Sequence, residues 1–242
     1  MSQRNDNLAV DRAIVRFWAT RAGQLKKQKK SNLVDHGNRG AVTGGKQMDG
    51  FVDILTELTV SAGIPRKYIF TKEGVLPGFF RPTKDWDFVV ISPQKNLISC
   101  IELKSQVGSF GNNFNNRTEE ALGNAVDIWT AYREGSFSCQ SAPWLGFLMV
   151  IEKSSKSTSS IKIAEPHFRA RKEFNKSSYL KRYELLCKKL MRERLYTSTC
   201  LIWTKRSKQK ANYGYLDSSL SFKSFANAYF AYLRGRKSEF EV

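Results

Sequence analysis

The sequence predicts a single α/β domain, because segments of helical periodicity alternate along the chain with segments of strand character. Residues 47–62 and 121–132 place apolar side chains at intervals of three and four, as one face of a helix does. Between them, residues 86–91 and 97–103 are short, mostly apolar segments, and 144–151 is a nearly continuous apolar run. The chain of 242 residues, 41% of them hydrophobic, is long enough to bury one sizeable core.

The first part of the chain is predicted to hold two helices joined by a loop. Residues 7–25 have an amphipathic pattern that ends in a cluster of lysines. Residues 36–46 contain four glycines, too many for regular structure, and are predicted to form a loop. The helix over 47–62 is expected to stop at Gly63, a residue favoured where helices end.

The middle of the chain is predicted to form a β-hairpin from residues 86–91 and 97–103. The following residues, 105–117, are mostly Gly, Asn, Ser and Gln and indicate a polar loop. A helix should then begin near Asn116, which forms a capping pair with Glu119. The strand over 144–151 completes a core of about 44–152 within one domain, 1–242.

A basic C-terminal part, 153–242, follows a serine-rich stretch that indicates an exposed loop. This part carries 21 Lys and Arg against 7 Asp and Glu, and the whole chain has a net charge of +18. A fold gains nothing from such self-repulsion, whereas a polyanion is attracted by it, so nucleic acid is the expected partner. The segments expected here are a helix, a strand and a helix, at 179–191, 197–204 and 222–233.

Other classes of protein are disfavoured by the composition. The four cysteines form no CxxC pair and there are only two histidines, so neither a zinc site nor a disulfide framework is expected. No signal peptide and no apolar run of transmembrane length is present, which favours a cytoplasmic protein without a membrane partner. The phosphate-facing candidates are four basic clusters, at 26–30, 169–172, 181–194 and 205–210.

Three charged residues of the hairpin are predicted to converge. Side chains alternate between the faces of a strand, so Ile98, Cys100, Glu102 and Lys104 should share one face. Asp87, at the start of the preceding strand, can lie beside them because the hairpin returns the chain. Burying unpaired charge on this largely apolar face would cost several kcal/mol, which favours a metal site over an incidental ion pair.

The chemistry of this group suits phosphodiester hydrolysis. Two carboxylates offer only oxygen ligands, which select a hard ion such as Mg²⁺. Asp87 and Glu102 would hold the ion, which lowers the pKa of a bound water, and Lys104 would orient or deprotonate that water and offset charge on the phosphate. The predicted catalytic residues are therefore Asp87, Glu102 and Lys104.

This pattern resembles the PD-(D/E)xK nuclease motif, with Glu102-Leu103-Lys104 as its second half and Lys84-Asp85-Trp86 where many members have Pro before the first Asp. The predicted order of elements is similar to the common αβββαβ core of these nucleases, a central mixed sheet flanked by helices, here with extra N- and C-terminal helical elements. The segments 44–50 (GGKQMDG) and 86–90 (WDFVV) resemble, more narrowly, the XhoI family of type II restriction endonucleases.

The resemblance implies a Mg²⁺-dependent homodimer from a prokaryotic cell that cuts double-stranded DNA at the palindrome CTCGAG and leaves 5′ phosphates. A methyltransferase of the same restriction–modification system is expected, but not as a binding partner. The main chain of Leu103 would join the metal site. An upstream helix often adds an acid in such nucleases, and Asp53 and then Glu57 are favoured over Asp49, although a solvated acidic face is as good an interpretation for any one of them.

Sequence recognition would use Arg or Lys on guanine and Asn or Gln on adenine. The two polar segments offer these side chains, and ordinary surface loops are the alternative. The predicted DNA-binding residues are Asn38, Arg39, Lys46, Gln106, Asn112, Asn113, Asn115 and Arg117.

Two other functions remain open at this stage. A repair or junction-resolving nuclease would share the catalytic residues but recognise DNA shape. A DNA-binding protein without catalysis would carry Asp87, Glu102 and Lys104 only as an ion-paired group, and metal-dependent strand breakage separates it from the nucleases.

Overall fold

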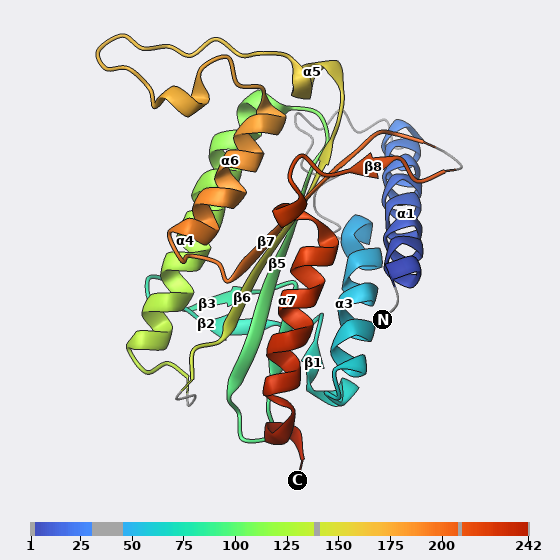
Figure 1. The fold of residues 1–242 in the computed structure, drawn as a ribbon, viewed down its shortest axis with the longest axis vertical. Coiled ribbons are helices and arrows are strands. Elements are labelled where there is room, and N and C mark those ends of the chain that lie inside the picture. The colour runs from blue at the N-terminus through green and yellow to red at the C-terminus, as the bar shows by residue number, and fades with distance from the viewer. Residues whose placement is uncertain (1–2, 31–45, 138–140, 208–209, 242) are drawn as a thin grey trace.

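The computed structural model describes residues 3–30, 46–137, 141–207 and 210–241, with the side chains of the first segment described over 7–24. The chain forms a mixed β-sheet with helices on both faces (Figure 1), so the predicted α/β class is confirmed. In the described part of the chain, no helix has the length and apolar character needed to cross a membrane.

The main sheet has six strands in the order β1-β4-β5-β6-β7-β8. The central strands β5, β6 and β7 are parallel, while β1, β4 and β8 run antiparallel to their neighbours. A separate hairpin pairs β2 with β3. The strands are β1 Ile69–Phe70, β2 Val75–Pro77, β3 Thr83–Asp85, β4 Phe88–Ile91, β5 Leu97–Gln106, β6 Trp144–Glu152, β7 Ser198–Thr204 and β8 Tyr213–Gly214.

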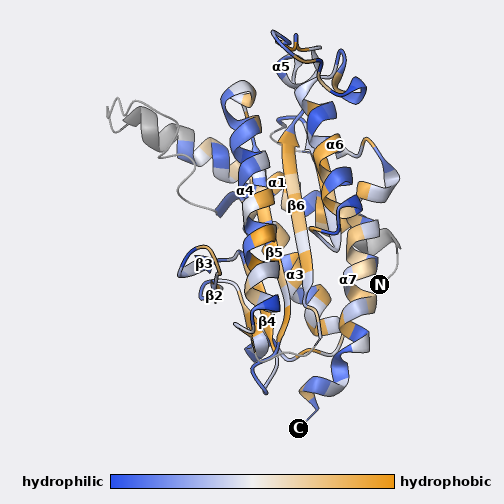
Figure 2. Cartoon of the chain, turned by 90° about the vertical axis from the view of Figure 1, so that its left-hand side faces the viewer, coloured by the Kyte–Doolittle hydropathy of each residue, from blue (hydrophilic) through white to orange (hydrophobic). Residues whose placement is uncertain are grey.

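Helices α1, α3 and α7 cover one face of this sheet, and α4 and α6 cover the other (Figure 1). Strands β5 and β6, which are largely apolar (Figure 2), lie between the two helix layers seen in Figure 1. The α-helices are α1 Gln3–Lys30, α3 Asp49–Ser61, α4 Phe110–Arg133, α5 Ser155–Thr158, α6 Tyr179–Arg192 and α7 Phe222–Gly235. The 3-10 helices are η1 Lys46–Met48, η2 Arg66–Tyr68, η3 Lys172–Phe174, η4 Ser218–Leu220 and η5 Lys237–Phe240.

Strand β6 shows why the sequence folds this way. Its side chains alternate between two hydrophobic clusters, with Leu148 and Val150 facing α3 and α7, and Phe147 and Met149 facing α4 and α6. A parallel strand covered on both faces needs apolar residues at every position, which is what the run 144–151 provides. The predicted buried strand is confirmed.

The predicted alternation of side chains along β5 holds only in part. Val90 pairs with Ser99 and Ile91 pairs with Leu97, which leaves Ile98 as an extra residue in a β-bulge. Ile98 therefore packs in the cluster on the α3 and α7 face, not beside Cys100 on the other face, and its predicted orientation was wrong. The bulge lies before Cys100, so the orientation of Glu102 and Lys104 is unaffected.

The prediction of a polar loop over residues 105–117 was also wrong. Strand β5 continues to Gln106, and α4 begins at Phe110. Phe110 and Phe114, four residues apart, both pack against Tyr179 of α6, with ring centroids 6.0 and 6.3 Å away. This packing outweighs the low helix propensity of the intervening Gly and Asn residues.

The basic C-terminal part joins the same sheet. Strand β7 pairs with β6 in the middle of the sheet, and α7 packs on the face shared with α3. The turn-rich residues 74–82, which gave no strand signal, form most of the β2–β3 hairpin. The side chain of Asp127 in α4 holds this hairpin by accepting hydrogen bonds from the backbone N–H groups of Phe79 and Phe80 at 2.9 and 2.8 Å.

Candidate active site

Asp87 lies beside strand β5, at the point where strand β4 begins. Phe88, the first residue of β4, pairs with Ile101, so the preceding Asp87 lies next to Glu102. The Leu103 N–H donates a hydrogen bond to Asp87 Oδ2 at 2.7 Å. The structure thus brings together Asp87, Glu102 and Lys104, as the alternation of side chains predicted.

Glu102 is almost fully buried between two lysines. Its Oε1 forms an ion pair with Lys104 Nζ, and its Oε2 lies 2.6 Å from Lys84 Nζ, while only 2% of its side chain is exposed. Lys84 Nζ also donates to the Asp85 carbonyl oxygen at 2.8 Å and lies 4.5 Å from the ring centroid of Trp86. The site therefore contains two carboxylates and two ammonium groups.

Burial and the neighbouring charge alter the acidity of this group. Burial first, and then the nearby Glu102 carboxylate, raise the pKa of Asp87 to about 6, while the Leu103 N–H and the two lysines act in the opposite direction. Burial alone would lower the pKa of Lys104, but its ion pair and hydrogen bond with Glu102, together with the charges of Asp87 and Glu120, outweigh that effect and raise it. Lys104 is therefore held in its charged form.

The oxygen atoms of this site fit a hard divalent cation. In the described chain no hydrogen bond reaches Asp87 Oδ1, which leaves that oxygen available. The N–H and C=O groups of one residue point to the same side of a strand, so the Leu103 carbonyl faces the side on which its N–H meets Asp87. The described residues contain no group of three or more His, Cys, Asp and Glu side chains suited to a metal, and the carboxylates that the structure brings together here are those of Asp87 and Glu102.

The candidate acids of α3 lie elsewhere. Asp53 pairs with Arg16 at 2.5 Å, and Glu57 pairs with Arg66 at 2.6 Å, with 67% and 63% of these acidic side chains exposed. Asp49 also pairs with Arg16. The structure does not bring Asp53 or Glu57 into one metal-binding group with Asp87 and Glu102.

The predicted DNA-binding residues fall into different environments. Asn38 and Arg39 lie outside the described residues, and Lys46 is exposed at the start of η1. Gln106 is buried, and its side chain donates to the Gly108 carbonyl oxygen at 2.6 Å. Gln106 thereby orders the turn between β5 and α4.

The remaining predicted residues lie on the first turns of α4. Asn112 and Asn115 are exposed and three positions apart, so they share one side of the helix. Asn113 donates to the Ser109 carbonyl oxygen at 2.7 Å, and Arg117 forms an ion pair with Glu120 at 2.5 Å. Asn112 and Asn115 are therefore the two that face outward without such an internal bond in the described chain.

Two residues near the site, Lys84 and Gln47, were not predicted from the sequence. Lys84 belongs to β3, a strand that the pattern of turn residues conceals. Gln47 of η1 donates to Ser105 Oγ at 2.7 Å and accepts from Arg21 at 3.1 Å, which ties α1 and η1 to the residue after Lys104. The Gly-Gly-Lys-Gln-Met-Asp-Gly segment was noticed, but no local pattern showed that Gln47 would be buried.

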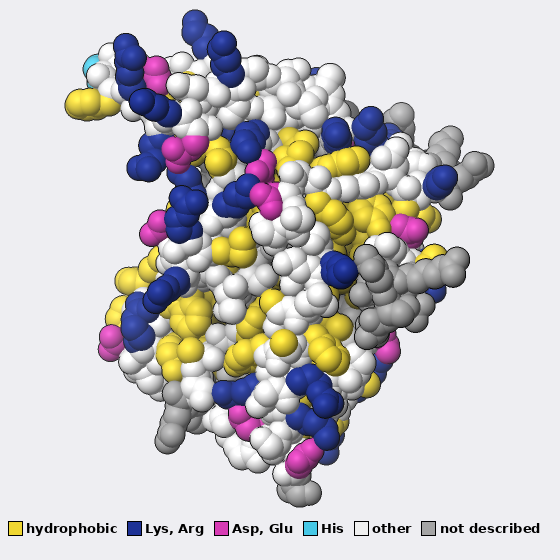
Figure 3. Space-filling view, viewed as in Figure 1, with side chains coloured by type: hydrophobic (Ala, Val, Ile, Leu, Met, Phe, Trp, Pro, Cys, Tyr) yellow, Lys and Arg dark blue, Asp and Glu magenta, His cyan; other side chains and the backbone are white. Residues whose placement is uncertain are grey.

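The parallel strands place basic residues at their common carboxyl end. Lys153 follows β6 and lies 4.0 Å from the ring centroid of Trp203 in β7, and the exposed Lys205 and Arg206 follow β7. Lys and Arg side chains also cover the edge formed by α6 and the segment before it (Figure 3). The exposed basic residues of that segment are Lys162, Arg169, Arg171, Lys172 and Lys176.

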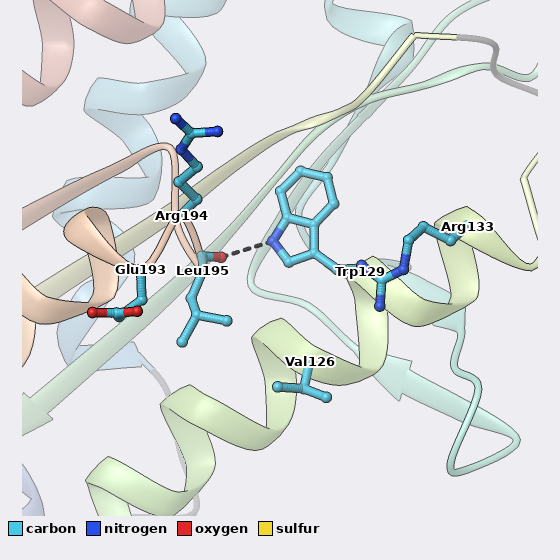
Figure 4. Close-up of a pocket in the computed structure, with 6 residues that line it drawn as sticks. All are labelled: Val126, Trp129, Arg133, Glu193, Arg194 and Leu195. Atoms are coloured by element: carbon cyan, nitrogen blue, oxygen red, sulfur yellow. Dashed lines mark hydrogen bonds between the residues drawn. The ribbon is translucent and has the colours of Figure 1, made fainter.

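A surface pocket of about 290 Å³ lies apart from this site, between α4 and the turn that follows α6 (Figure 4). The indole N–H of Trp129, which lines the pocket, donates a hydrogen bond to the Leu195 carbonyl oxygen at 2.8 Å. This bond fixes α4 to the turn after α6. The pocket is lined by Val126, Trp129, Arg133, Glu193, Arg194 and Leu195. It contains one acid and two arginines but none of Asp87, Glu102 and Lys104, so we assign it no role in catalysis.

A buried carboxylate–lysine group in a mixed sheet, in a chain of net charge +18, fits a nuclease, and the comparisons with known proteins assign the chain to that class. The family model described as "Restriction endonuclease XhoI" matches residues 27–216, more than half of the chain. The chain belongs to the XhoI family of restriction endonucleases.

Curated relatives agree with this assignment. The type II restriction enzyme BstVI of Geobacillus stearothermophilus is 53% identical over 184 residues, which cover 74% of this chain and 82% of that enzyme. The type II restriction enzyme XhoI of Xanthomonas vasicola is 41% identical over 182 residues, covering 74% and 72%. AbrI of Azospirillum brasilense, also a type II restriction enzyme, is 44% identical over 160 residues, covering 65% and 71%. No solved structure gives a significant match.

Proposed function

We propose that the chain cuts both strands of DNA at the palindrome CTCGAG, leaves 5′-phosphate ends, depends on Mg²⁺, and acts as a homodimer in the cytoplasm of a prokaryotic cell. The observation that carries the proposal is the convergence of Asp87, Glu102 and Lys104 at the start of β4 and in β5 of a chain that belongs to the XhoI family. The palindrome and the ends come from the resemblance to that family.

The order of elements supports a PD-(D/E)xK core. Helix α3 is followed by the antiparallel strands β1, β4 and β5, then by α4 and by β6 parallel to β5. That is the αβββαβ order, with the β2–β3 hairpin inserted before β4. Asp87 lies just before β4, and Glu102 and Lys104 lie in β5 just beyond its last residue paired with β4, so the charged residues gather where that pairing ends.

The chemistry follows from the atoms available. Asp87, Glu102 and the Leu103 carbonyl would hold Mg²⁺, which when bound supplies an activated water and neutralises charge on the phosphate. Lys104 is held charged beside Glu102, so it can orient the attacking water and offset the negative charge that develops on the phosphate oxygens. Asp53 and Glu57 would join only after leaving Arg16 and Arg66.

The duplex is proposed to lie along the carboxyl end of β5, β6 and β7, where basic residues gather. Exposed Asn112 and Asn115, on the first turns of α4, would read bases, since Asn can make two hydrogen bonds to adenine in the major groove. Lys46, with Asn38 and Arg39 of the preceding segment, would contact the backbone or bases. Gln106, Asn113 and Arg117 would order the DNA-binding surface that they help to build.

Cleavage of both strands of a palindrome needs two catalytic centres related by two-fold symmetry. One copy of the chain supplies one group of Asp87, Glu102 and Lys104, so a second copy would supply the other centre. The homodimer is proposed on this ground.

Incubation with supercoiled plasmid that carries one CTCGAG site tests the proposal. The wild-type chain should give one linear product in Mg²⁺ and none in EDTA, and Glu102→Gln should lower the rate by a factor of about 10³ or more. Glu134→Gln, the same change at an exposed glutamate outside the site, is the matched control and should leave the rate within a few-fold.

Three other outcomes separate the alternatives. Mg²⁺-dependent nicking without a preferred site would favour a repair or junction-resolving nuclease. Salt-sensitive DNA binding with no cleavage in any divalent metal would favour a non-catalytic binding protein. Loss of activity in both Glu57→Gln and Glu102→Gln would place Glu57 in the metal site after all.

A further inference from the structure

Lys84 is the most enclosed cation of the catalytic group. Its side chain is 12% exposed, against 25% for Lys104, and it reaches Glu102 from β3, a strand outside the main sheet. Three contacts fix the ammonium group: Glu102 Oε2 at 2.6 Å, the Asp85 carbonyl oxygen at 2.8 Å and the Trp86 ring at 4.5 Å from its centroid. Such a set of contacts holds a charge in one place.

The hairpin that carries Lys84 is itself firmly held. Besides the two backbone N–H groups, Arg81 Nε donates to Asp127 Oδ2 at 2.7 Å, and Arg81 Nη2 donates to Asn124 at 2.8 Å. Only 6% of the Asp127 side chain is exposed. Gly78 at the turn has no room for a Cβ, which would lie 2.6 Å from Asp127 Oδ2. Lys84 is thus delivered to Glu102 by a rigid support.

Both oxygens of Glu102 are occupied by lysines, which sets up a competition. A divalent cation that binds Glu102 must displace Lys84 or Lys104 from one oxygen, or share that oxygen with it. The two lysines balance the two carboxylates, so an added divalent cation leaves two uncompensated positive charges in a buried site, which is unfavourable. The phosphate of DNA carries the negative charge that would offset them.

We propose that Lys84 is a positioning residue that competes with the divalent metal for Glu102 and thereby makes metal binding depend on DNA. This inference rests on the proposed function of the site. Metal and DNA then bind cooperatively, and by linkage each strengthens the binding of the other by the same factor. A chain without DNA would hold the metal weakly and so would seldom be ready to cut.

Calorimetric titration with Ca²⁺, a probe that also prefers oxygen ligands, tests this inference without relying on activity. The wild-type chain should bind Ca²⁺ at least about tenfold more tightly with a CTCGAG duplex than without it, with the duplex verified intact by gel electrophoresis. Lys84→Met keeps an apolar side chain against Trp86 but removes the charge. This variant should bind Ca²⁺ at least about tenfold more tightly than wild type in the absence of DNA, and the effect of the duplex should shrink.

Three variants make the interpretation specific. Lys84→Arg retains a cation and should behave as wild type, while Lys84→Gln should behave as Lys84→Met and serves if the latter folds poorly. Lys72→Met removes one charge from an exposed residue and should not change Ca²⁺ binding, which excludes an effect of net charge. Glu102→Ala should abolish binding at the site.

The failures of this inference and of the proposed function are distinct. If Glu102→Ala abolishes Ca²⁺ binding but Lys84→Met and wild type bind it equally without DNA, Lys84 does not compete with the metal, and the proposed function stands. If no Glu102-dependent binding occurs in any variant even with the duplex, the metal site itself is wrong and both proposals fall.

Discussion

Asp87 binds its proton more tightly in the folded chain than in the unfolded chain, because burial and Glu102 disfavour its charge. Its pKa rises from 3.8 to about 6, so protonation favours folding. The stability contributed is full below the unfolded pKa and is lost as pH rises through the folded pKa. At neutral pH without metal, ionised Asp87 therefore lowers the free energy of unfolding.

Asp87→Asn should relieve this cost, because Asn keeps an oxygen to accept from the Leu103 N–H but carries no charge. In EDTA we expect the variant to be more stable than wild type by about 2 kcal/mol near pH 7.5, with the difference much smaller near pH 4.5. Urea unfolding at the two pH values measures both numbers. Asp85→Asn, at an exposed neighbouring aspartate, is the control, and a pH-independent loss of stability in Asp87→Asn would contradict the argument.

Single residues were predictable where the determining interactions are local. Glu102 and Lys104 share a face because they are two positions apart in one strand. Asp87 lies beside them because residues 86–103 form a hairpin, which the sequence of these residues alone predicts. Lys84 depends on a hairpin that folds only through Asp127, 48 positions from Phe79, so no nearby residue indicates it. The acidic residues of α3 share one face of the helix, as their spacing predicted. The arginines that pair with them belong to α1 and η2, so the sequence of α3 alone does not indicate these ion pairs.

Elements were predictable when their pattern matched the layer that covers them. The strand over 144–151 and the helix over 47–62 were predicted correctly because the strand is covered by a hydrophobic cluster on each face and the helix packs one face into a single cluster. The first turns of α4 were not predicted, since Tyr179 of α6, whose aromatic contacts make them helical, lies 69 positions from Phe110 and 65 from Phe114 along the chain. The bulge at Ile98 likewise depends on how β4 and β5 align, which neither strand determines alone.

Two glycines test how tightly these elements pack. A Cβ on Gly146 of β6 would lie 2.4 Å from Trp144 and 3.0 Å from Phe225 of α7, both buried, so Gly146→Ala should lower the free energy of unfolding by about 2 kcal/mol. Gly123 lies in α4 with nothing near a Cβ, so Gly123→Ala should raise it by about 0.5–1 kcal/mol.

Urea denaturation of the two variants beside wild type measures both effects. Because each change adds one methyl group, the opposite signs separate packing from backbone propensity. A neutral Gly146→Ala would mean that α7 can move away from β6 at little cost, and that the helix does not hold the sheet as described.

At the scale of the whole molecule, some basic side chains are neutralised by ion pairs with acidic residues and others are not. Lys188 of α6 is neutralised by Glu184 and Asp217, at 2.7 and 2.6 Å, so it adds little to the field that DNA would meet. Lys205, exposed after β7 at the carboxyl end of the parallel strands, has no acidic partner in the described chain. The sequence showed the net charge but not which lysines remain available.

Binding to a duplex without the palindrome, measured in EDTA over a range of NaCl concentrations, should reveal this difference. Each phosphate neutralised releases counterions, so the logarithm of the binding constant should fall linearly with the logarithm of salt concentration, by about 0.9 per contact. Lys205→Gln should reduce that slope by about 1, whereas Lys188→Gln, the same substitution at a neutralised lysine, should leave it unchanged. Equal effects of the two substitutions would show that net charge alone attracts DNA, and that the carboxyl end of the sheet is not where the duplex lies.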